Sequence, residues 1–328
     1  MPPPKRGYPD LHDHIEALRK AGLLVEIDEP INKDTEMHPL VRWQFRGGIN
    51  EADRKAFLFN NITDSLGRKY DIPVVIGALA TNPEIYKIGI GCEPNKIGET
   101  WNHAISNPIK PNHVDNAPCH EVIETGEDLI GEGKGLDALP IPISTPGFDS
   151  APYLTATNVI TKDPETGIQN SGTYRAGLKA SNRMAVRMVI RPGGAEGYIH
   201  WKKWKERGEP MPCAIVIGCP PAFNYMSPQK LKMGYDEIDV AGGLVGDLVE
   251  HLEELRVSGV GLAVLLEHAV YRLPSGGGTR PNSPRSSPDD WPAYWRFESR
   301  SVRACAQKKR LRAWRRIQFL EVSHRVRV

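Results

Sequence analysis

Residues 169–175 read Gln-Asn-Ser-Gly-Thr-Tyr-Arg, and this stretch carries more information than any other part of the chain. It follows a β-branched run at 154–161 and a turn of sequence Asp-Pro-Glu-Thr-Gly at 163–167. These signals predict a hairpin whose second strand contains the stretch. An amide, an aromatic ring and a guanidinium on one rigid strand can hold a phosphate, a metal and a carboxylate together. An exposed hairpin with a surface arginine is the structural alternative.

Three further blocks stand in the same order as in a known family. Tyr-Pro-Asp-Leu-His-Asp begins at Tyr8, Met-His-Pro-Leu-Val-Arg-Trp-Gln-Phe-Arg-Gly at Met37, and Gly-Cys-Pro-Pro-Ala at Gly218. Together with residues 151–194 they resemble the UbiD family of decarboxylases, which use prenylated FMN. The resemblance runs from about residue 8 to about residue 250, three quarters of the chain. Several separated blocks are more specific than any single motif.

Residues 1–135 are interpreted as an α/β domain. Asp10 caps a helix with a regular apolar face, and Asn82-Pro83 has the cap and first-turn proline of a second helix. Short apolar runs predict three strands, at 24–27, 56–59 and 74–76. None of these elements carries chemistry by itself, so this domain is predicted to be a scaffold.

Residues 136–273 are interpreted as strands separated by tight turns. We expect an antiparallel meander with one apolar face, then a helix and a buried strand. The expected strands lie at 154–161, 168–178 and 184–190, the helix at 195–207 and the buried strand at 213–218. Ser227-Pro228 predicts the start of another helix. The family resemblance implies that this region is an antiparallel split β-barrel that binds flavin, incomplete at its C-terminal end.

Residues 274–328 differ sharply from the rest. Thirteen Lys and Arg against four Asp and Glu in residues 280–328 leave residues 1–279 with a net charge of −7, because the whole chain carries +2. A Ser-, Gly- and Pro-rich linker leads into a segment where Trp is interspersed among basic residues. The family's further C-terminal segments are not recognisable there. We therefore expect a basic tail that is disordered or frameshifted, with a genuine divergent end as the alternative.

Composition and the start of the chain indicate the cellular compartment of the protein. No apolar run approaches the ~18 residues of a membrane span. The start of the chain has neither the apolar core of a signal peptide nor the pattern of a transit peptide. Its five cysteines lie far apart, without metal-ligand spacing or a disulfide framework. These features predict a cytoplasmic protein.

The resemblance implies a set of site residues. Asn170 matches the family asparagine that ligates a divalent metal, usually Mn²⁺, between protein and flavin phosphate, whereas the residues alone favour a turn-forming Asn beside Gly172. Arg175 matches the catalytic arginine that faces the substrate carboxylate, which its fork can bind bidentately; a surface ion pair is the alternative. K⁺ is a further candidate ion. Cofactor contacts are implied at Thr173, Tyr174, Arg175, Arg187, Met188, Val189, Pro192 and Gly193.

Two parts of the family site have no match. Some members place a metal-binding histidine near this loop, where the ungapped match gives Gly194. His200 reaches the site only if the loop shifts, so a histidine on a helix surface is the prediction. The family's glutamate ligand and proton donor come from segments beyond the position of Glu250. No motif supports Glu253, Glu254 or Glu267, and without these groups cofactor binding and product protonation should weaken.

The resemblance implies non-oxidative decarboxylation, in one or both directions, of an aromatic (hydroxybenzoate-like) or conjugated carboxylic acid. Loss of CO₂ leaves an sp² carbanion, and a cofactor must accept its charge. The Gln-Asn-x-Gly-x-Tyr-Arg form is typical of the branch with phenolic-acid and polyprenyl-hydroxybenzoate decarboxylases. A flavin prenyltransferase is implied as the cofactor supplier, and family members often form homo-oligomers.

The competing hypothesis is an inactive flavin-fold remnant or binding protein whose tail contacts nucleic acid or acidic partners. Basic residues interspersed with aromatics suit phosphate binding and base stacking. The arginines of the tail nevertheless form no helical stripe, and out-of-frame translation of a GC-rich gene also yields Arg and Trp. Nucleic-acid binding is therefore the weaker hypothesis. Flavin absorbance in the purified protein distinguishes the two.

Overall fold

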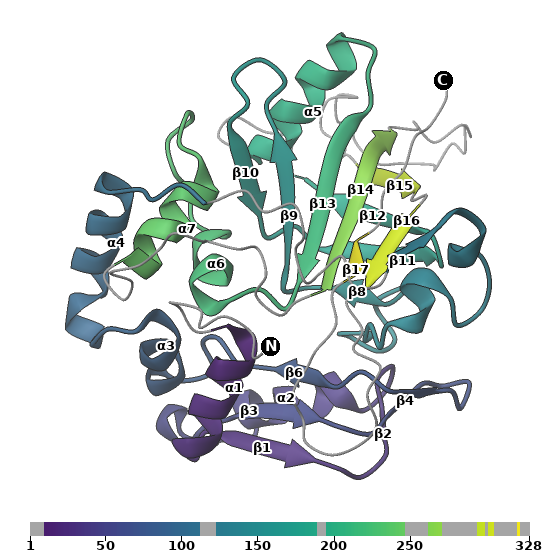
Figure 1. Ribbon diagram of the computed structural model, residues 1–328. Coiled ribbons are helices and arrows are strands. Elements are labelled where there is room, and N and C mark those ends of the chain that lie inside the picture. The colour runs from purple at the N-terminus through teal and green to yellow at the C-terminus, as the bar shows by residue number, and fades with distance from the viewer. Residues whose placement is uncertain are drawn as a thin grey trace, which may run out of the picture.

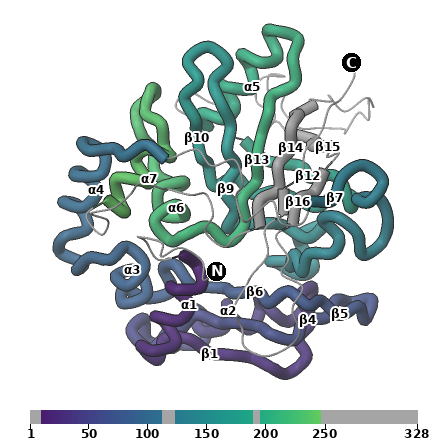
Figure 2. Tube along the Cα trace, viewed as in Figure 1, coloured from purple at the N-terminus to yellow at the C-terminus, as the bar shows by residue number. Residues whose placement is uncertain are grey.

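The computed structural model describes residues 10–111, 123–188 and 195–246, and the backbone of four strands at 262–270, 294–298, 301–304 and 320–321. Figure 1 shows the N-terminal part lying below a large sheet, with α4, α6 and α7 beside the β10 edge. Figure 2 traces the same arrangement along the Cα atoms. Apart from the strand backbones at 294–298, 301–304 and 320–321, the basic tail expected at 274–328 lies outside the described residues.

The N-terminal part contains the helices and strands that the pattern predicted. Its helices are α1 (Leu11–Lys20), α2 (Met37–Arg46), α3 (Pro83–Ile90) and α4 (Ile97–Ser106), and its strands are β1 (Leu24–Ile27), β2 (Ile31–Asn32), β3 (Ala56–Phe59), β4 (Ile62–Thr63), β5 (Lys69–Tyr70) and β6 (Val74–Ile76). The three expected strands are confirmed as one sheet of order β1-β3-β6. A second sheet has the order β2-β4-β5.

Both expected helix caps are present. The Asp10 side chain accepts the amide of Asp13, and the Asp13 side chain accepts the amide of Asp10, which closes a capping box at the start of α1. The Asn82 side chain accepts the amide of Ile85 at the start of α3, where Pro83 occupies the first turn. Local hydrogen bonds therefore set the beginnings of these helices.

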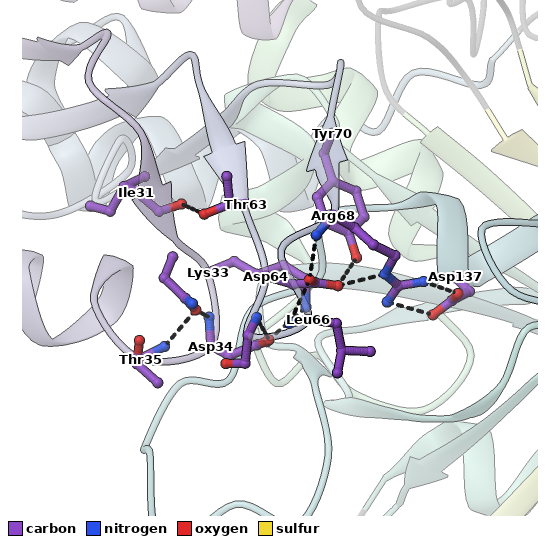
Figure 3. A network of polar contacts seen from close by, with 12 residues as sticks. Ile31, Lys33, Asp34, Thr35, Thr63, Asp64, Leu66, Arg68, Tyr70 and Asp137 are labelled. Carbon is purple, nitrogen blue, oxygen red and sulfur yellow. Dashed lines mark hydrogen bonds and ion pairs between the residues drawn. The ribbon is translucent and has the colours of Figure 1, made fainter.

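A polar network joins the N-terminal part to the segment that leads into the large sheet (Figure 3). Arg68 donates to Asp64 over 2.6 Å and to Asp137 over 2.5 Å, and the Tyr70 hydroxyl donates to Asp64 over 3.0 Å. Burial disfavours the charged form of Asp64, but the hydrogen bonds from Arg68, Tyr70 and backbone amides outweigh burial and lower its pKa to about 2. Arg68 thus bridges two carboxylates from distant parts of the sequence.

The second part is built on an eight-stranded antiparallel sheet of order β10-β9-β13-β14-β15-β12-β11-β8. Its strands are β8 (Tyr153–Leu154), β9 (Thr157–Lys162), β10 (Gln169–Gly172), β11 (Ala176–Ala180), β12 (Arg183–Arg187), β13 (Met211–Ile217), β14 (Leu262–Val270) and β15 (Tyr294–Glu298). The helices are α5 (Glu196–Glu206), α6 (Pro221–Met226) and α7 (Glu237–Val245). A small sheet of order β17-β16-β7 joins β7 (Ile123–Thr125), β16 (Ser301–Ala304) and β17 (Leu320–Glu321).

The expected hairpin is confirmed, but the single strand expected at 168–178 is wrong. β10 ends at Gly172 and pairs with β9, whereas β11 begins at Ala176 and pairs with β12 and β8. The chain breaks because the Tyr174 amide donates to the Gly172 carbonyl over 2.9 Å, which closes a tight turn. Four residues span at most about 14 Å, so the sheet must curl to bring these strands together. Within the described residues no strand pairing closes the curl into a barrel.

The helix expected to start at Ser227-Pro228 is also wrong. Helix α6 ends at Met226 with Ser227 as its C-cap, and α7 begins only at Glu237. The Ser227 hydroxyl donates to the Phe223 carbonyl and is therefore engaged with the preceding helix. The Asp236 side chain caps α7 by accepting the amide of Ile238.

The core lies between the curled sheet and α5. Met184, Val186 and Met188 are fully buried, which confirms the apolar face predicted for β12. Helix α7 packs against α4 at Gly243, where an added Cβ would lie 2.7 Å from the Ala104 carbonyl oxygen. Among the described residues no helix combines the length and hydropathy needed to cross a bilayer.

Candidate functional site

Asn170 lies in strand β10 and not in a turn. It is 3% exposed and pairs across the hairpin with Thr161 of β9. Its side-chain amide donates to the Tyr174 hydroxyl over 3.4 Å. The Tyr174 ring folds back over Gly172, where any side chain would overlap the ring carbons. The turn-forming interpretation of this asparagine therefore does not hold, and the stretch forms one compact unit.

The first turn of α7 presents two carboxylates to the edge of β10. Glu237 accepts the Ser171 amide over 2.6 Å, and Asp236 accepts the Gln169 amide over 2.9 Å. Glu237 is 5% exposed, and burial, aided by repulsion from Glu196 and Asp236, raises its pKa to about 8 against the Ser171 hydrogen bond. The carboxylate is thus held beside Asn170 in an environment that disfavours its charge.

These groups fit a divalent cation. In the described part of the chain, Glu237 has no ion pair with Lys or Arg, and a carboxylate and a carboxamide are hard oxygen ligands. No cluster of three or more His, Cys, Asp or Glu placed to hold a metal occurs among the described residues. The protein would therefore supply part of the coordination shell, and a phosphate could supply more.

Sequence reasoning missed Glu237. The available signal was its position: it is an acidic residue that opens a helix whose other residues, apart from Asp239, are apolar, and it directly follows the capping residue Asp236. Of the glutamates considered beyond residue 250, Glu253 and Glu254 lie outside the described residues. Glu267 lies in β14, of which only the backbone is described.

The expectation that His200 is a surface histidine is wrong. His200 is 1% exposed, its Nδ1 lies 3.0 Å from the Thr161 hydroxyl, and its Nε2 lies 3.8 Å from the Glu196 carboxylate. Burial lowers the pKa of His200 to about 4, so the ring is neutral at pH 7. The histidine is buried because α5 packs its face against β9 and β10. It therefore supports Thr161, the cross-strand neighbour of Asn170.

Arg175, which directly precedes β11, and Arg187, the last residue of β12, form a neighbouring pair. The Arg187 amide donates to the Arg175 carbonyl over 3.1 Å, so the two residues lie directly opposite one another. Their neighbours Ala176 and Val186 face the core, and alternation along the strands turns both guanidinium groups to the other face. Both are exposed, and within the described residues neither forms an ion pair. Two adjacent cations suit an anionic ligand.

The remaining predicted site residues have different surroundings. Thr173 is exposed, and its amide donates to the Ser227 carbonyl over 3.4 Å. Burial raises the pKa of Tyr174 to about 12, so its hydroxyl stays protonated. The Met188 side chain belongs to the core, which leaves only its backbone for a ligand. Outside the described residues lie Val189, Pro192 and Gly193.

The structure thus joins Asn170 to Tyr174 by a hydrogen bond, places the Glu237 carboxylate on the amide of Ser171, the residue after Asn170, and sets Arg175 beside Arg187. No hydrogen bond or ion pair between described residues joins the first group (Asn170, Tyr174 and Glu237) to the second (Arg175 and Arg187). The two groups are connected through the backbone, because Tyr174, which belongs to the first group, directly precedes Arg175. A ligand that spans both groups would carry an anionic end for each.

Comparison with protein families decides the relationship. Residues 15–105 match the 3-octaprenyl-4-hydroxybenzoate carboxy-lyase N-terminal domain, and residues 112–265 match the 3-octaprenyl-4-hydroxybenzoate carboxy-lyase Rift-related domain. The chain belongs to the UbiD family. The second match extends past residue 250, where the resemblance was expected to end.

Solved structures share the fold. The UbiD-class enzyme HmfF from Pelotomaculum thermopropionicum, in complex with FMN, aligns with a TM-score of 0.65 at 22% identity over 89% of this chain and 62% of its own. Vanillic acid decarboxylase from Sedimentibacter hydroxybenzoicus, in closed form, gives 0.70 at 19% identity over 98% and 65%. The apo 3,4-dihydroxybenzoic acid decarboxylase from Enterobacter cloacae gives 0.63 at 20% over 96% and 64%. This UbiD chain spans about two thirds of their length.

Proposed function

We propose that this UbiD-family chain is a carboxy-lyase that decarboxylates an aromatic, hydroxybenzoate-like or conjugated carboxylic acid, reversibly, with prenylated FMN. The observation that carries the proposal is the stretch before the exposed Arg175, where buried Asn170 donates to the Tyr174 hydroxyl and the buried Glu237 carboxylate accepts the Ser171 amide. Relatives of the same fold support the reaction class, since they include decarboxylases of vanillic and 3,4-dihydroxybenzoic acid and a UbiD-class enzyme whose structure was solved in complex with prenylated FMN.

In this proposal Asn170 and Glu237 hold a divalent cation, Mn²⁺, against the flavin phosphate. The buried pair offers two oxygen ligands, and the absence of a cationic partner for Glu237 among the described residues favours an added cation. The remaining cofactor contacts are the backbone at Thr173, Tyr174 and Met188, the Arg187 side chain, and Val189, Pro192 and Gly193. When bound, the prenylated flavin supplies the electron sink for decarboxylation.

Arg175 orients the substrate. Its guanidinium presents parallel N–H donors that match a carboxylate, and a bidentate contact fixes both the position and the plane of that group. Because this contact is lost as CO₂ leaves, the arginine's role is to align the bond that breaks. The buried, protonated Tyr174 hydroxyl holds the Asn170 amide and so keeps the cation site in register with Arg175.

The wider proposal includes the expected organisation and partners. We propose an α/β domain at 1–135, a split-barrel cofactor domain at 136–273 and a basic tail at 274–328; the curl of the large sheet supports the barrel. A flavin prenyltransferase would supply the cofactor, K⁺ is a second candidate ion, and the location is cytoplasmic. A homo-oligomer is supported by a relative of the same fold that was solved in an evolved dimeric form.

The test is reconstitution of the purified chain with prenylated FMN and Mn²⁺, followed by CO₂ release from vanillate and 3,4-dihydroxybenzoate. Asn170→Ala is expected to lose bound metal and flavin together, measured by elemental analysis and flavin absorbance. Asn102→Ala, an exposed asparagine on α4, is the matched control and should keep both. An unchanged flavin load in Asn170→Ala refutes the bridging role.

A further inference from the structure

Tyr153 packs over a glycine in the large sheet. It stands directly opposite Gly177, in the pairing of β8 with β11. A Cβ added at Gly177 would lie 2.7 Å from Cε1 and 3.0 Å from Cζ of the Tyr153 ring. The missing side chain therefore leaves the space that the ring occupies. The tyrosine is half-buried, so part of it remains accessible.

The ring shares a face of the sheet with Arg175. Leu154 and Ala176, the neighbours that pair across the same strands, belong to the core. Alternation therefore places Tyr153, Gly177 and Arg175 together on the opposite face. Arg175 directly precedes β11 and stands two residues before Gly177, which in extended chain sets their Cα atoms about 6.6 Å apart. The Tyr153 ring and the Arg175 side chain thus arise from neighbouring positions on that face.

The positions next to Tyr153 in the sheet carry small residues. Ala185 of β12 is the other cross-strand neighbour of Gly177, so a tyrosine, a glycine and an alanine stand side by side. Neither Gly177 nor Ala185 has a side chain beyond Cβ, so no long side chain from these two positions stands between Tyr153 and the arginines. The Asn170 network lies instead on β10, at the opposite end of the strand order. The phosphate end of a ligand and the Tyr153 surface thus belong to different parts of the site.

We propose that Tyr153 is a specificity-determining residue that stacks against the ring of an aromatic carboxylate whose acid group is held by Arg175. The inference rests on the proposed function and goes beyond it by naming what selects the substrate class. A flat aromatic ring gains offset stacking with Tyr153, and a saturated ring of the same size does not. Arg175 selects for the acid, and Tyr153 selects for the aromatic ring.

The test measures affinity for benzoate and cyclohexanecarboxylate by calorimetry on the full chain, with and without FMN. The wild-type protein should bind benzoate more tightly. Tyr153→Leu should weaken benzoate about 3- to 10-fold, the range of an aromatic pair, and leave cyclohexanecarboxylate unchanged. Tyr153→Phe keeps the ring and should retain the preference. Arg175→Gln should weaken both acids alike.

Four results separate the possibilities. Equal wild-type affinity for the two acids overturns the stacking role without any variant, even if Tyr153→Leu fails to fold. Equal weakening of both acids by Tyr153→Leu makes the residue merely structural. Loss of FMN binding in Tyr153→Leu assigns the ring to the flavin instead. If Arg175→Gln binds both acids normally while Tyr153→Leu still loses the benzoate preference, the carboxylate clamp fails and the stacking inference stands.

Discussion

Glu237 should make the protein less stable as the pH rises, and Glu237→Gln should remove this effect. The glutamine has nearly the same shape, and its carbonyl oxygen can accept the Ser171 amide that Glu237 accepts over 2.6 Å. The substitution therefore changes the charge while it keeps the packing. The difference between the two proteins isolates the cost of ionising a buried carboxylate without a cation.

The magnitude follows from the two pKa values. The pKa of Glu237 is about 8 in the fold, against an ordinary 4.5. Below pH 4.5 the carboxyl is protonated in both states and contributes no difference. Above it the unfolded chain releases a proton that the folded chain retains, so the free energy of unfolding falls by about 1.36 kcal/mol per pH unit. The variant should therefore be more stable by about 3 kcal/mol at pH 7, rising to about 5 kcal/mol above pH 8.

The assay is urea unfolding followed by circular dichroism at pH 4.5, 7 and 8.5 in EDTA, then again with Mn²⁺. In EDTA the variant should gain on the wild type as the pH rises. With Mn²⁺ the wild type should regain the advantage, because a bound cation stabilises only the fold that binds it. Glu51→Gln, at an exposed glutamate, is the control and should change nothing. Parallel loss of stability in wild type and Glu237→Gln from pH 4.5 to 8.5 refutes the reasoning.

Three further substitutions test other parts of the structure. Arg175→Gln should abolish CO₂ release while flavin absorbance stays normal, and full turnover would remove the carboxylate clamp. Asp64→Asn should lower the free energy of unfolding by about 2 kcal/mol near neutral pH, because the lowered pKa of Asp64 stabilises the fold above pH 3.8. This stabilisation is lost as the pH falls toward 2, and equal acid unfolding of both proteins contradicts the prediction. Gly243→Ala should lower the free energy of unfolding by about 1–3 kcal/mol, because the added Cβ would collide with backbone oxygens at the end of α4. Gly98→Ala is the control in the thermal melt, because a Cβ added there has no atom within 4 Å.

Local patterns predicted the local structure well. The caps at Asp10 and Asn82, the β9–β10 hairpin and the buried alternation of Met184 and Val186 all follow from interactions within a few residues, and all are confirmed. These features depend on hydrogen bonds and side-chain alternation that the chain specifies by itself. The same kind of reasoning failed at Ser227, where a Ser-Pro pair that usually begins a helix ends one.

The amino-acid sequence alone determined the family, through separated blocks in order, and it singled out Asn170 and Arg175. It could not show that Glu237 approaches Ser171 across 66 residues, or that His200 is buried beneath Thr161. Nor could it show that the strand containing Asn170 stops at Gly172, because that break depends on Tyr174 folding back over the glycine. Contacts between distant segments exist only after the sheet curls and α5 and α7 pack against it, and those contacts, not local propensity, decide which polar groups are buried together.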